Sequence, residues 1–216
     1  MDNILFEQRL HEGATALGLS LSPEVGGVLF KLMQELLRWN AKVNLTAITA
    51  PEEVLEKHFL DSLAVLPEVA SASHLMDLGA GAGFPGLPLK VACPALEVSL
   101  VDAVGKKVAF IKAAAVALRL TGVRGLHVRA EGQAEREKLP LVDRLVARAF
   151  MDLGDWLTLA PAYLAPGGEI IAMLGRSLSH DELASRAASH GLTLRSAREY
   201  ALPFSGAGRQ VAVFAR

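Results

Sequence analysis

The stretch that decides the fold is Asp77-Leu78-Gly79-Ala80-Gly81-Ala82-Gly83-Phe84-Pro85-Gly86. It follows the short apolar run 75–78 and leads into a helical pattern that opens at Pro85. Glycines let the backbone turn tightly and let a ligand approach the main chain. The free N–H groups at a helix start favour a carboxylate or a phosphate. The stretch therefore predicts a strand, a ligand-binding loop and a helix in succession.

The loop fits two kinds of ligand. Residues 81–86 match the pattern G-x-G-x-x-G of dinucleotide sites, which by itself is a weak signal. Residues 77–83 read D-x-G-x-G-x-G, and an acid at that place can accept hydrogen bonds from an ammonium group, which suits a ligand with an amino-acid end. Asp102 ends the next apolar run, where a carboxylate can bind both ribose hydroxyls. Nicotinamide and S-adenosylmethionine sites share that carboxylate, so Asp102 does not choose between them.

After the loop, short apolar strands alternate with helical stretches. The expected strands are 75–78, 98–101, 126–129, 145–149 and 169–174, and the expected helices are 86–92, 105–121, 152–164 and 179–190. This alternation is typical of an α/β fold with a parallel sheet covered on both faces. The last strands, 193–202 and 209–215, have only a turn-rich stretch between them, which predicts an antiparallel hairpin at the edge of the sheet.

The first 70 residues predict helices only. Ser22-Pro23-Glu24 is typical of a helix start, and an apolar stripe at three- and four-residue steps follows it. Thr49-Ala50-Pro51-Glu52 predicts a second start with a capping box. We therefore expect a helical N-terminal cap over residues 1–70 and an α/β domain over residues 71–216.

Composition narrows the class of protein. The chain has 216 residues, a formal charge of -1 and one cysteine, Cys93, so no internal disulfide can form. No apolar run approaches the length of about 18 residues that a membrane span needs, and no signal peptide is evident. We expect a cytoplasmic protein with no membrane partner. The six histidines show no metal-ligand spacing, and we expect no metal site.

Eight short blocks, taken together, carry a family resemblance. They are Trp39-Asn40, Asn44-Leu45-Thr46, His58-Phe59-Leu60-Asp61-Ser62, the loop 77–88, Leu100-Val101-Asp102, Gly105-Lys106-Lys107, Arg129-Ala130-Glu131 and Ala147-Arg148-Ala149-Phe150. In this order and spacing the chain resembles the small-subunit ribosomal RNA guanine-N7 methyltransferases, also called the glucose-inhibited division protein B family. The resemblance implies a class I S-adenosylmethionine-dependent methyltransferase fold, which is Rossmann-like, with S-adenosylmethionine as donor. It implies N7 of a guanine in 16S ribosomal RNA as acceptor, with the RNA or the small subunit as partner. We also expect a monomer.

The resemblance also implies site residues. Those expected to contact the donor are Asp77, Gly79, Gly81, Gly83, Phe84, Asp102, Ala130, Glu131 and Arg148. Those expected to position the substrate are Asn44, His58, Arg148 and Arg209. Two positions depart from the family pattern, namely Leu174 after the fifth strand and Gln210 next to Arg209.

Two of these residues also fit a purely structural role. His58 falls on the apolar face of its helix, where a packed histidine is common. Arg148 ends the fourth strand, at the edge where α/β sheets bind ligands, but it can also simply pair with Asp143 or Asp152.

The sequence lacks motifs that methylation at guanine N7 does not need. Guanine N7 has a lone pair and no proton, so its methylation needs alignment rather than a general base. Accordingly the chain has no Pro-Pro loop of the amino-group methyltransferases after the fourth strand, and Cys93 fits core packing better than nucleophilic attack. Three alternatives remain open: a small-molecule methyltransferase with the cap as a lid, a nicotinamide oxidoreductase, and a binding module without catalysis.

Overall fold

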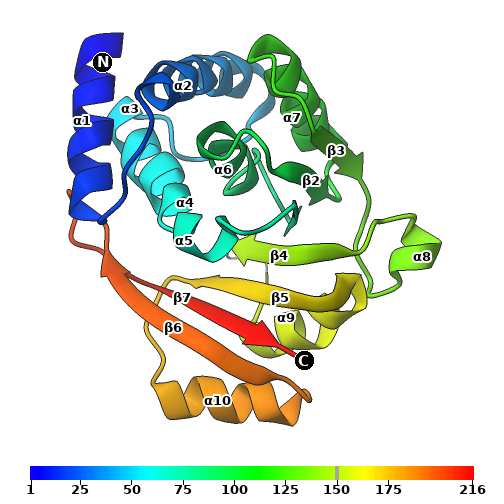
Figure 1. Cartoon of the computed structure of the whole chain (residues 1–216). Coiled ribbons are helices and arrows are strands. Elements are labelled where there is room, and N and C mark those ends of the chain that lie inside the picture. Colours follow the sequence, from blue (N-terminus) through cyan, green and yellow to red (C-terminus); the bar gives the residue numbers. More distant parts are fainter. Residues whose placement is uncertain (149–150) are drawn as a thin grey trace.

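The computed structural model describes residues 1–148 and 151–216. The described residues form one seven-stranded sheet in the order β3-β2-β1-β4-β5-β7-β6 (Figure 1). The strands are β1 (His74–Leu78), β2 (Glu97–Asp102), β3 (Val123–His127), β4 (Val142–Arg148), β5 (Leu164–Leu174), β6 (Thr193–Ala201) and β7 (Gly208–Ala215). Strands β1 to β5 pair in parallel, whereas β7 lies antiparallel between β5 and β6. The predicted α/β fold, mostly parallel with a C-terminal hairpin, is confirmed.

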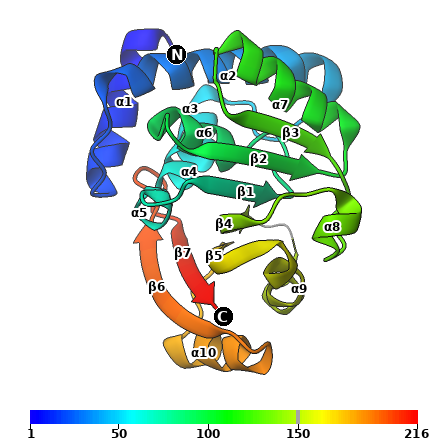
Figure 2. The ribbon, with the colours of Figure 1, turned by 45° about the vertical axis from the view of Figure 1, so that its right-hand side comes forward.

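Helices cover both faces of this sheet. They are α1 (Asn3–Ala16), α2 (Pro23–Val43), α3 (Pro51–Val54), the π-helical turn η1 (Leu55–Leu60), α4 (Asp61–Leu63), α5 (Leu66–Val69), α6 (Gly86–Ala92), α7 (Gly105–Ala117), α8 (Ala134–Glu137), α9 (Leu153–Leu159), the 3-10 turn η2 (Ala160–Tyr163) and α10 (His180–Ser189). In Figure 2, α2 and α7 lie along one side of strands β1 to β3, and α10 lies beside β6 at the other end of the sheet. None of the described helices combines the length and hydropathy needed to span a membrane.

Alternate residues of each strand feed two separate cores, as the two-residue period of a strand requires. Along β4, Val146 joins the core under α2, α6 and α7, while Leu145 and Ala147 join the core under α9 and α10. All are nearly inaccessible to solvent. The apolar strands of the sequence are therefore explained by burial on both faces. Ala149, expected at the end of this strand, lies outside the described residues.

The third strand differs from its prediction. It begins at Val123, three residues early, because β3 pairs residue by residue with β2 from Val98 onward. Gly125 lies in the middle of this pairing, where α7 packs so closely that a Cβ would stand 3.1 Å from the side chain of Lys112. The alternation of apolar and polar residues in the sequence gives no sign that β3 and α7 pack so closely.

The helix starts of the cap also differ in detail. Ala50, not Thr49, is the N-cap of α3, and it makes no side-chain cap bond, so the predicted capping box is wrong. Ser22 is the N-cap of α2 as expected, although its hydroxyl makes no cap bond either. A proline follows each of them, and proline brings no N–H group that needs a cap.

Polar contacts and a shared core tie the cap to the sheet. The Glu56 carboxylate accepts hydrogen bonds from the backbone N–H groups of Phe204 (2.7 Å) and Ser205 (2.6 Å) in the C-terminal hairpin. Arg198 of β6 forms an ion pair with Glu68 at 2.9 Å. One hydrophobic core contains side chains of α1, α2 and η1 together with those of β1, β2 and β7. The boundary near residue 70 stays a prediction.

Gln210 gives a first test of the packing. Its side chain is buried in β7, where Oε1 accepts from the Leu178 N–H (3.0 Å) and Nε2 donates to the Leu178 carbonyl (2.9 Å). Gln210→Ala leaves both backbone groups unpaired, and we expect a loss of about 2 kcal/mol of unfolding free energy, or about 4–8 °C in Tm. Thermal unfolding of the variant checks this, with exposed Gln8→Ala as the matched control. Equal Tm values for the two variants would contradict the expectation.

Candidate active site

A cleft opens where β1, β2, β4 and β5 end, the edge at which α/β sheets bind ligands. It consists of two adjoining hollows that share Gly79. The cap-side hollow, about 580 Å³, lies between the glycine loop, the cap and the ends of β4, β5 and β7. The β2–β3 hollow, about 640 Å³, lies between residues 101–107 and 128–131. Both are of the size that small ligands occupy.

The glycine loop forms the floor between these hollows. Gly79 and Gly81 line the cap-side hollow, whereas the buried Gly83 lines neither hollow. Gly81 has φ +59°, a conformation that side chains disfavour, and its N–H donates to Asp102 at 2.9 Å. Gly86 opens α6 so close to β2 that a Cβ would meet Leu100 at 2.2 Å. The loop therefore owes its shape to both conformational freedom and close packing.

Asp102 joins the loop to the end of β2. One carboxylate oxygen accepts from Gly81, the other accepts from the Val104 N–H at 2.8 Å, and Lys107 Nζ stands 3.8 Å away. The side chain lines the β2–β3 hollow and is almost buried. A carboxylate has about four acceptor positions, so after these two N–H bonds Asp102 can still accept from a ligand.

Asp77 lies beneath the loop rather than on its surface. Its carboxylate is fully buried and lines neither hollow. Oδ2 accepts from the Gly86 N–H at 2.9 Å, and among the described residues Oδ1 has no hydrogen-bond partner. Burial raises the pKa of Asp77 to about 7, although the Gly86 bond and the charge of Arg148 act in the opposite direction. The expected direct contact with an ammonium group stays a prediction.

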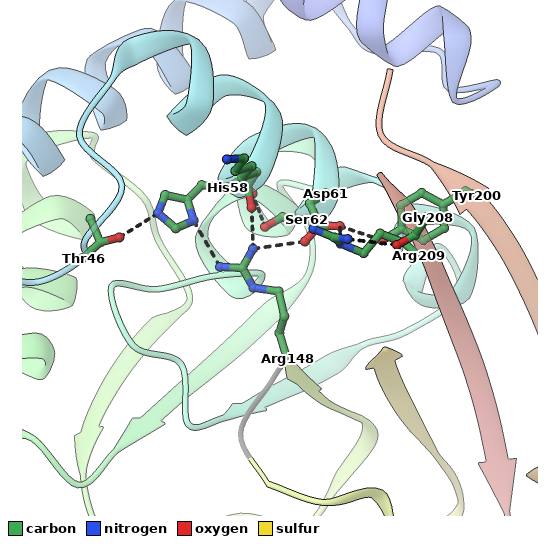
Figure 3. Close-up of polar contacts among 9 residues, drawn as sticks. Thr46, His58, Asp61, Ser62, Arg148, Tyr200, Gly208 and Arg209 are labelled. Carbon is green, nitrogen blue, oxygen red and sulfur yellow. Dashed lines mark hydrogen bonds and ion pairs between the residues drawn. The ribbon is translucent and has the colours of Figure 1, made fainter. Parts of the chain in front are cut away.

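Arg148, at the end of β4, reaches across the cleft to the cap (Figure 3). Its guanidinium donates to the Lys57 carbonyl (2.7 Å), to Asp61 Oδ2 (3.2 Å) and to His58 Nδ1 (3.2 Å). Within the π-helical turn the Asp61 N–H bonds to the carbonyls of Glu56 and His58 and bypasses that of Lys57, which accepts from Arg148. Such turns occur frequently at functional sites.

The pairing of Arg148 with nearby acids, which the sequence left open, is wrong. Asp143 accepts instead from the backbone N–H groups of Ser73 and His74, both at 2.7 Å. Asp152 caps α9 through the Gly154 N–H. Both carboxylates stabilise backbone ends, so Arg148 pairs with an acid far away in the sequence.

His58 is held on three sides. Its ring stacks on Phe84 with centroids 4.4 Å apart and planes 4° from parallel. Nδ1 faces Arg148, and Nε2 lies 3.0 Å from Thr46 Oγ1. Burial, with the charge of Arg148 adding to it, lowers the pKa of His58 to about 3, so the ring is neutral near pH 7. The residue is packed and hydrogen-bonded, as its purely structural role predicts, and it also lines the cap-side hollow.

Asp61 connects four elements of the fold. Besides Arg148, its carboxylate accepts from the Tyr200 hydroxyl at 2.8 Å and stands 3.5 Å from Arg209 Nε. Burial and this carboxylate raise the pKa of Tyr200. Asp61 was not among the predicted site residues, although it lies in the same sequence block as His58. Its position three residues after a histidine that faces the cleft was the signal that could have found it.

The other predicted residues lie at different depths of the cleft. Ala130 and Glu131 line the β2–β3 hollow. Arg209 lines the cap-side hollow. Asn44 lines neither, is exposed, and ends α2 with a left-handed backbone at φ +44°. Its expected role in positioning the substrate stays a prediction.

Thr46, two residues after Asn44, lines the cap-side hollow instead. It was not among the predicted site residues. The buried Asn40 holds it there by accepting from its N–H and donating to its carbonyl. The described residues contain no group of three or more His, Cys, Asp or Glu side chains placed to hold a metal ion.

A sheet of this order, with a glycine loop on its first strand, defines the class I S-adenosylmethionine-dependent methyltransferases. A SAM-dependent methyltransferase from Leishmania major has a TM-score of 0.60 at 15% identity, covering 85% of this chain and 83% of that one. A Burkholderia thailandensis 1,6-didemethyltoxoflavin-N1-methyltransferase, solved with S-adenosylhomocysteine, has a TM-score of 0.53 at 18% identity, covering 91% and 90%. These likenesses concern the fold.

Sequence comparison then gives the family. A family model described as GidB, rRNA small subunit methyltransferase G, matches residues 28–212, and the chain belongs to this family. A protein of Myxococcus xanthus named ribosomal RNA small subunit methyltransferase G is 68% identical over 216 residues, all of both chains. A relative of the same name from Anaeromyxobacter sp. is 49% identical over 207 residues, 96% of each chain. The protein is therefore an S-adenosylmethionine-dependent methyltransferase, which decides between the two cofactors that Asp102 left open.

Proposed function

We propose that the protein transfers the methyl group of S-adenosylmethionine to N7 of a guanine in 16S ribosomal RNA of the small subunit. The full-length likeness to relatives named for that RNA supports the substrate. One observation in the cleft supports N7: the His58 ring, which lines the cap-side hollow, has both nitrogens engaged and a pKa near 3. Asp61 is bound to Arg148, Arg209 and Tyr200. Neither group is free to remove a proton, and N7 carries none.

The described residues fit the donor. Asp102 accepts hydrogen bonds from the ribose hydroxyls with the positions that Gly81 and Val104 leave open. Ala130 and Glu131 hold the adenine end in the β2–β3 hollow. The backbone of Gly79 and Gly81, with the buried Gly83 next in the loop, faces the amino-acid end. The buried carboxylate of Asp77 supplies negative charge beneath that end, and its unpartnered Oδ1 fits this role.

On the substrate side, the cap-side hollow carries more positive than negative groups. Lys57, Arg148 and Arg209 line it, against Asp61 alone. A cationic wall suits the phosphates of RNA. We propose that Arg209 meets a phosphate, that Asn44 contacts RNA at the rim, and that Phe84 supports the site through His58. When bound, S-adenosylmethionine supplies a methyl group on a positively charged sulfur, and the residues of the cleft align the acceptor with it.

Nucleoside mass spectrometry of ribosomal RNA tests this function directly. RNA from cells that lack the protein should lose one 7-methylguanine from the small subunit, and the purified protein should restore it to isolated subunits or their RNA. Methylation of another atom would contradict N7. Transfer to a small molecule, with none to RNA, would favour the alternative of a small-molecule methyltransferase. We propose further that the protein works as a monomer in the cytoplasm, where the small subunit is its partner.

The pH dependence of donor affinity follows from Asp77. Its pKa is raised to about 7 in the free protein, and a nearby ammonium group favours the ionised carboxylate. Binding must therefore release a proton near and below pH 7, so affinity falls as the pH drops from 8 to 6 and is level above about 8. We expect about threefold to tenfold weaker binding of S-adenosylhomocysteine at pH 6 than at pH 8.

Calorimetry in buffers of different ionisation enthalpy checks this proton release. Asp77→Asn should remove both the release and the pH dependence. His58 does not interfere, because its pKa lies near 3. Equal affinity for S-adenosylhomocysteine at pH 6 and pH 8 in the unaltered protein would show that Asp77 does not respond to the donor.

A further inference from the structure

We propose that the hydroxyl group of Thr46 donates a hydrogen bond to O6 of the target guanine, with His58 and Arg148 as the positioning residues that orient it. This inference rests on the proposed function, because it concerns the base that is methylated. Thr46 then selects guanine over adenine.

The direction of each hydrogen bond around His58 is fixed by Arg148. A guanidinium can only donate, so His58 Nδ1, 3.2 Å from Arg148 Nη2, must accept. A neutral imidazole with an accepting Nδ1 carries its proton on Nε2. Nε2 therefore donates to Thr46 Oγ1 at 3.0 Å (Figure 3). The chain of bonds runs from Arg148 through His58 to Thr46.

Thr46 Oγ1 accepts a second bond from the Ile48 N–H at 3.1 Å. A hydroxyl oxygen has two lone pairs and one proton. With both lone pairs used, the remaining capacity of Thr46 is to donate, and no acceptor for this proton occurs among the residues that the structure describes. Thr46 lines the cap-side hollow together with Gly79 and Gly81 of the glycine loop, so a base bound in this hollow can supply the acceptor that the O–H lacks.

Guanine and adenine differ at the place that such a donor reads. Guanine presents the neighbouring acceptors N7 and O6, whereas adenine presents N7 and the donor N6–H₂. With N7 turned to the methyl group, O6 is the adjacent atom on the same edge. Thr46 has no lone pair left for an N6–H₂ group, so adenine would leave two donors facing each other. Discrimination between the bases thus follows from the filled lone pairs of Thr46.

The test compares Thr46→Val, Thr46→Ser and the control Thr49→Val, an exposed threonine of the same loop. We expect Thr46→Val to lower kcat/KM for RNA about 10- to 100-fold, with unchanged affinity for S-adenosylhomocysteine. Thr46→Ser and Thr49→Val should both stay near the unaltered protein, because the first keeps the hydroxyl and the second never faced the cleft.

A modified substrate separates recognition from structural damage. In RNA whose methylated guanine is replaced by 2-aminopurine, which lacks O6, Thr46→Val should be as active as the unaltered protein. His58→Ala should likewise lower the ratio of the methylation rate on the guanine RNA to that on the 2-aminopurine RNA. A loss of stability alone would lower both rates and leave this ratio unchanged.

Two results would overturn this inference and leave the proposed function intact. One is an equal loss of activity on both RNAs, and the other is weaker binding of S-adenosylhomocysteine by Thr46→Val, which would assign the hydroxyl to the donor. Failure of the proposed function looks different, because the unaltered protein would then methylate no guanine N7 at all, and both proposals would fall.

Discussion

Replacing Arg148 by alanine is expected to reduce methyl transfer at least about 100-fold, the cost of misplacing reacting groups by about 1 Å. Arg148 fixes the cap against β4 through the Lys57 carbonyl, Asp61 and His58. Without it, His58 loses the partner that sets its tautomer. Single-turnover rates with saturating donor and RNA would measure the effect on the aligned complex rather than on binding.

Arg144 is a matched control for Arg148. It lies at the other end of β4, is similarly buried, and forms an ion pair with Glu169 at 3.1 Å. Arg144→Ala should lower the Tm as Arg148→Ala does but should leave the single-turnover rate unchanged. Arg148→Lys should remain impaired, since an ammonium group cannot reproduce three bonds in fixed directions. A fully active Arg148→Ala would remove this residue from the mechanism.

The fold was predictable because its strongest signals are local. The glycine loop, the apolar strands and the closing hairpin each follow from a few neighbouring residues, and β1, β2 and β7 lie close to where the pattern predicts them. The register of β3 was not predictable, because Gly125 marks a contact with Lys112 that only the packed structure contains. The π-helical turn has no sequence signal that we recognise, although its Lys57 carbonyl accepts from Arg148.

The site was predictable in its parts but not in its connections. The residues around the glycine loop follow from strand ends and spacing, whereas Asp61 meets Arg148 across 87 positions of sequence. The predicted partners of Arg148 were acids close to it in the sequence, because a sequence contains no other measure of distance than separation along the chain. The role proposed for Thr46 has no sequence signal for a related reason, because it depends on His58 and Ile48 filling the lone pairs of its hydroxyl.

Asp102→Ala is expected to weaken binding of S-adenosylhomocysteine about 100- to 20,000-fold, the loss of two hydrogen bonds to a charged acceptor at about 1.5–3 kcal/mol each. The same change leaves the N–H groups of Gly81 and Val104 without their acceptor, so the loop also loses its anchor to β2. Asp102→Asn should not rescue binding. Each carboxylate oxygen now accepts from a different N–H, and an amide turns one of these acceptors into a donor.

A ligand without ribose hydroxyls separates the two effects. In the unaltered protein, the 2′,3′-dideoxy analogue of S-adenosylhomocysteine should bind much more weakly than the parent compound, because Asp102 loses its partners on the sugar. In Asp102→Ala the two ligands should bind alike, and the exposed control Asp155→Ala should behave as the unaltered protein. If Asp102→Ala still preferred the parent compound, another group would have to hold the sugar. Asp102 would then act only through Gly81, as a support for the loop.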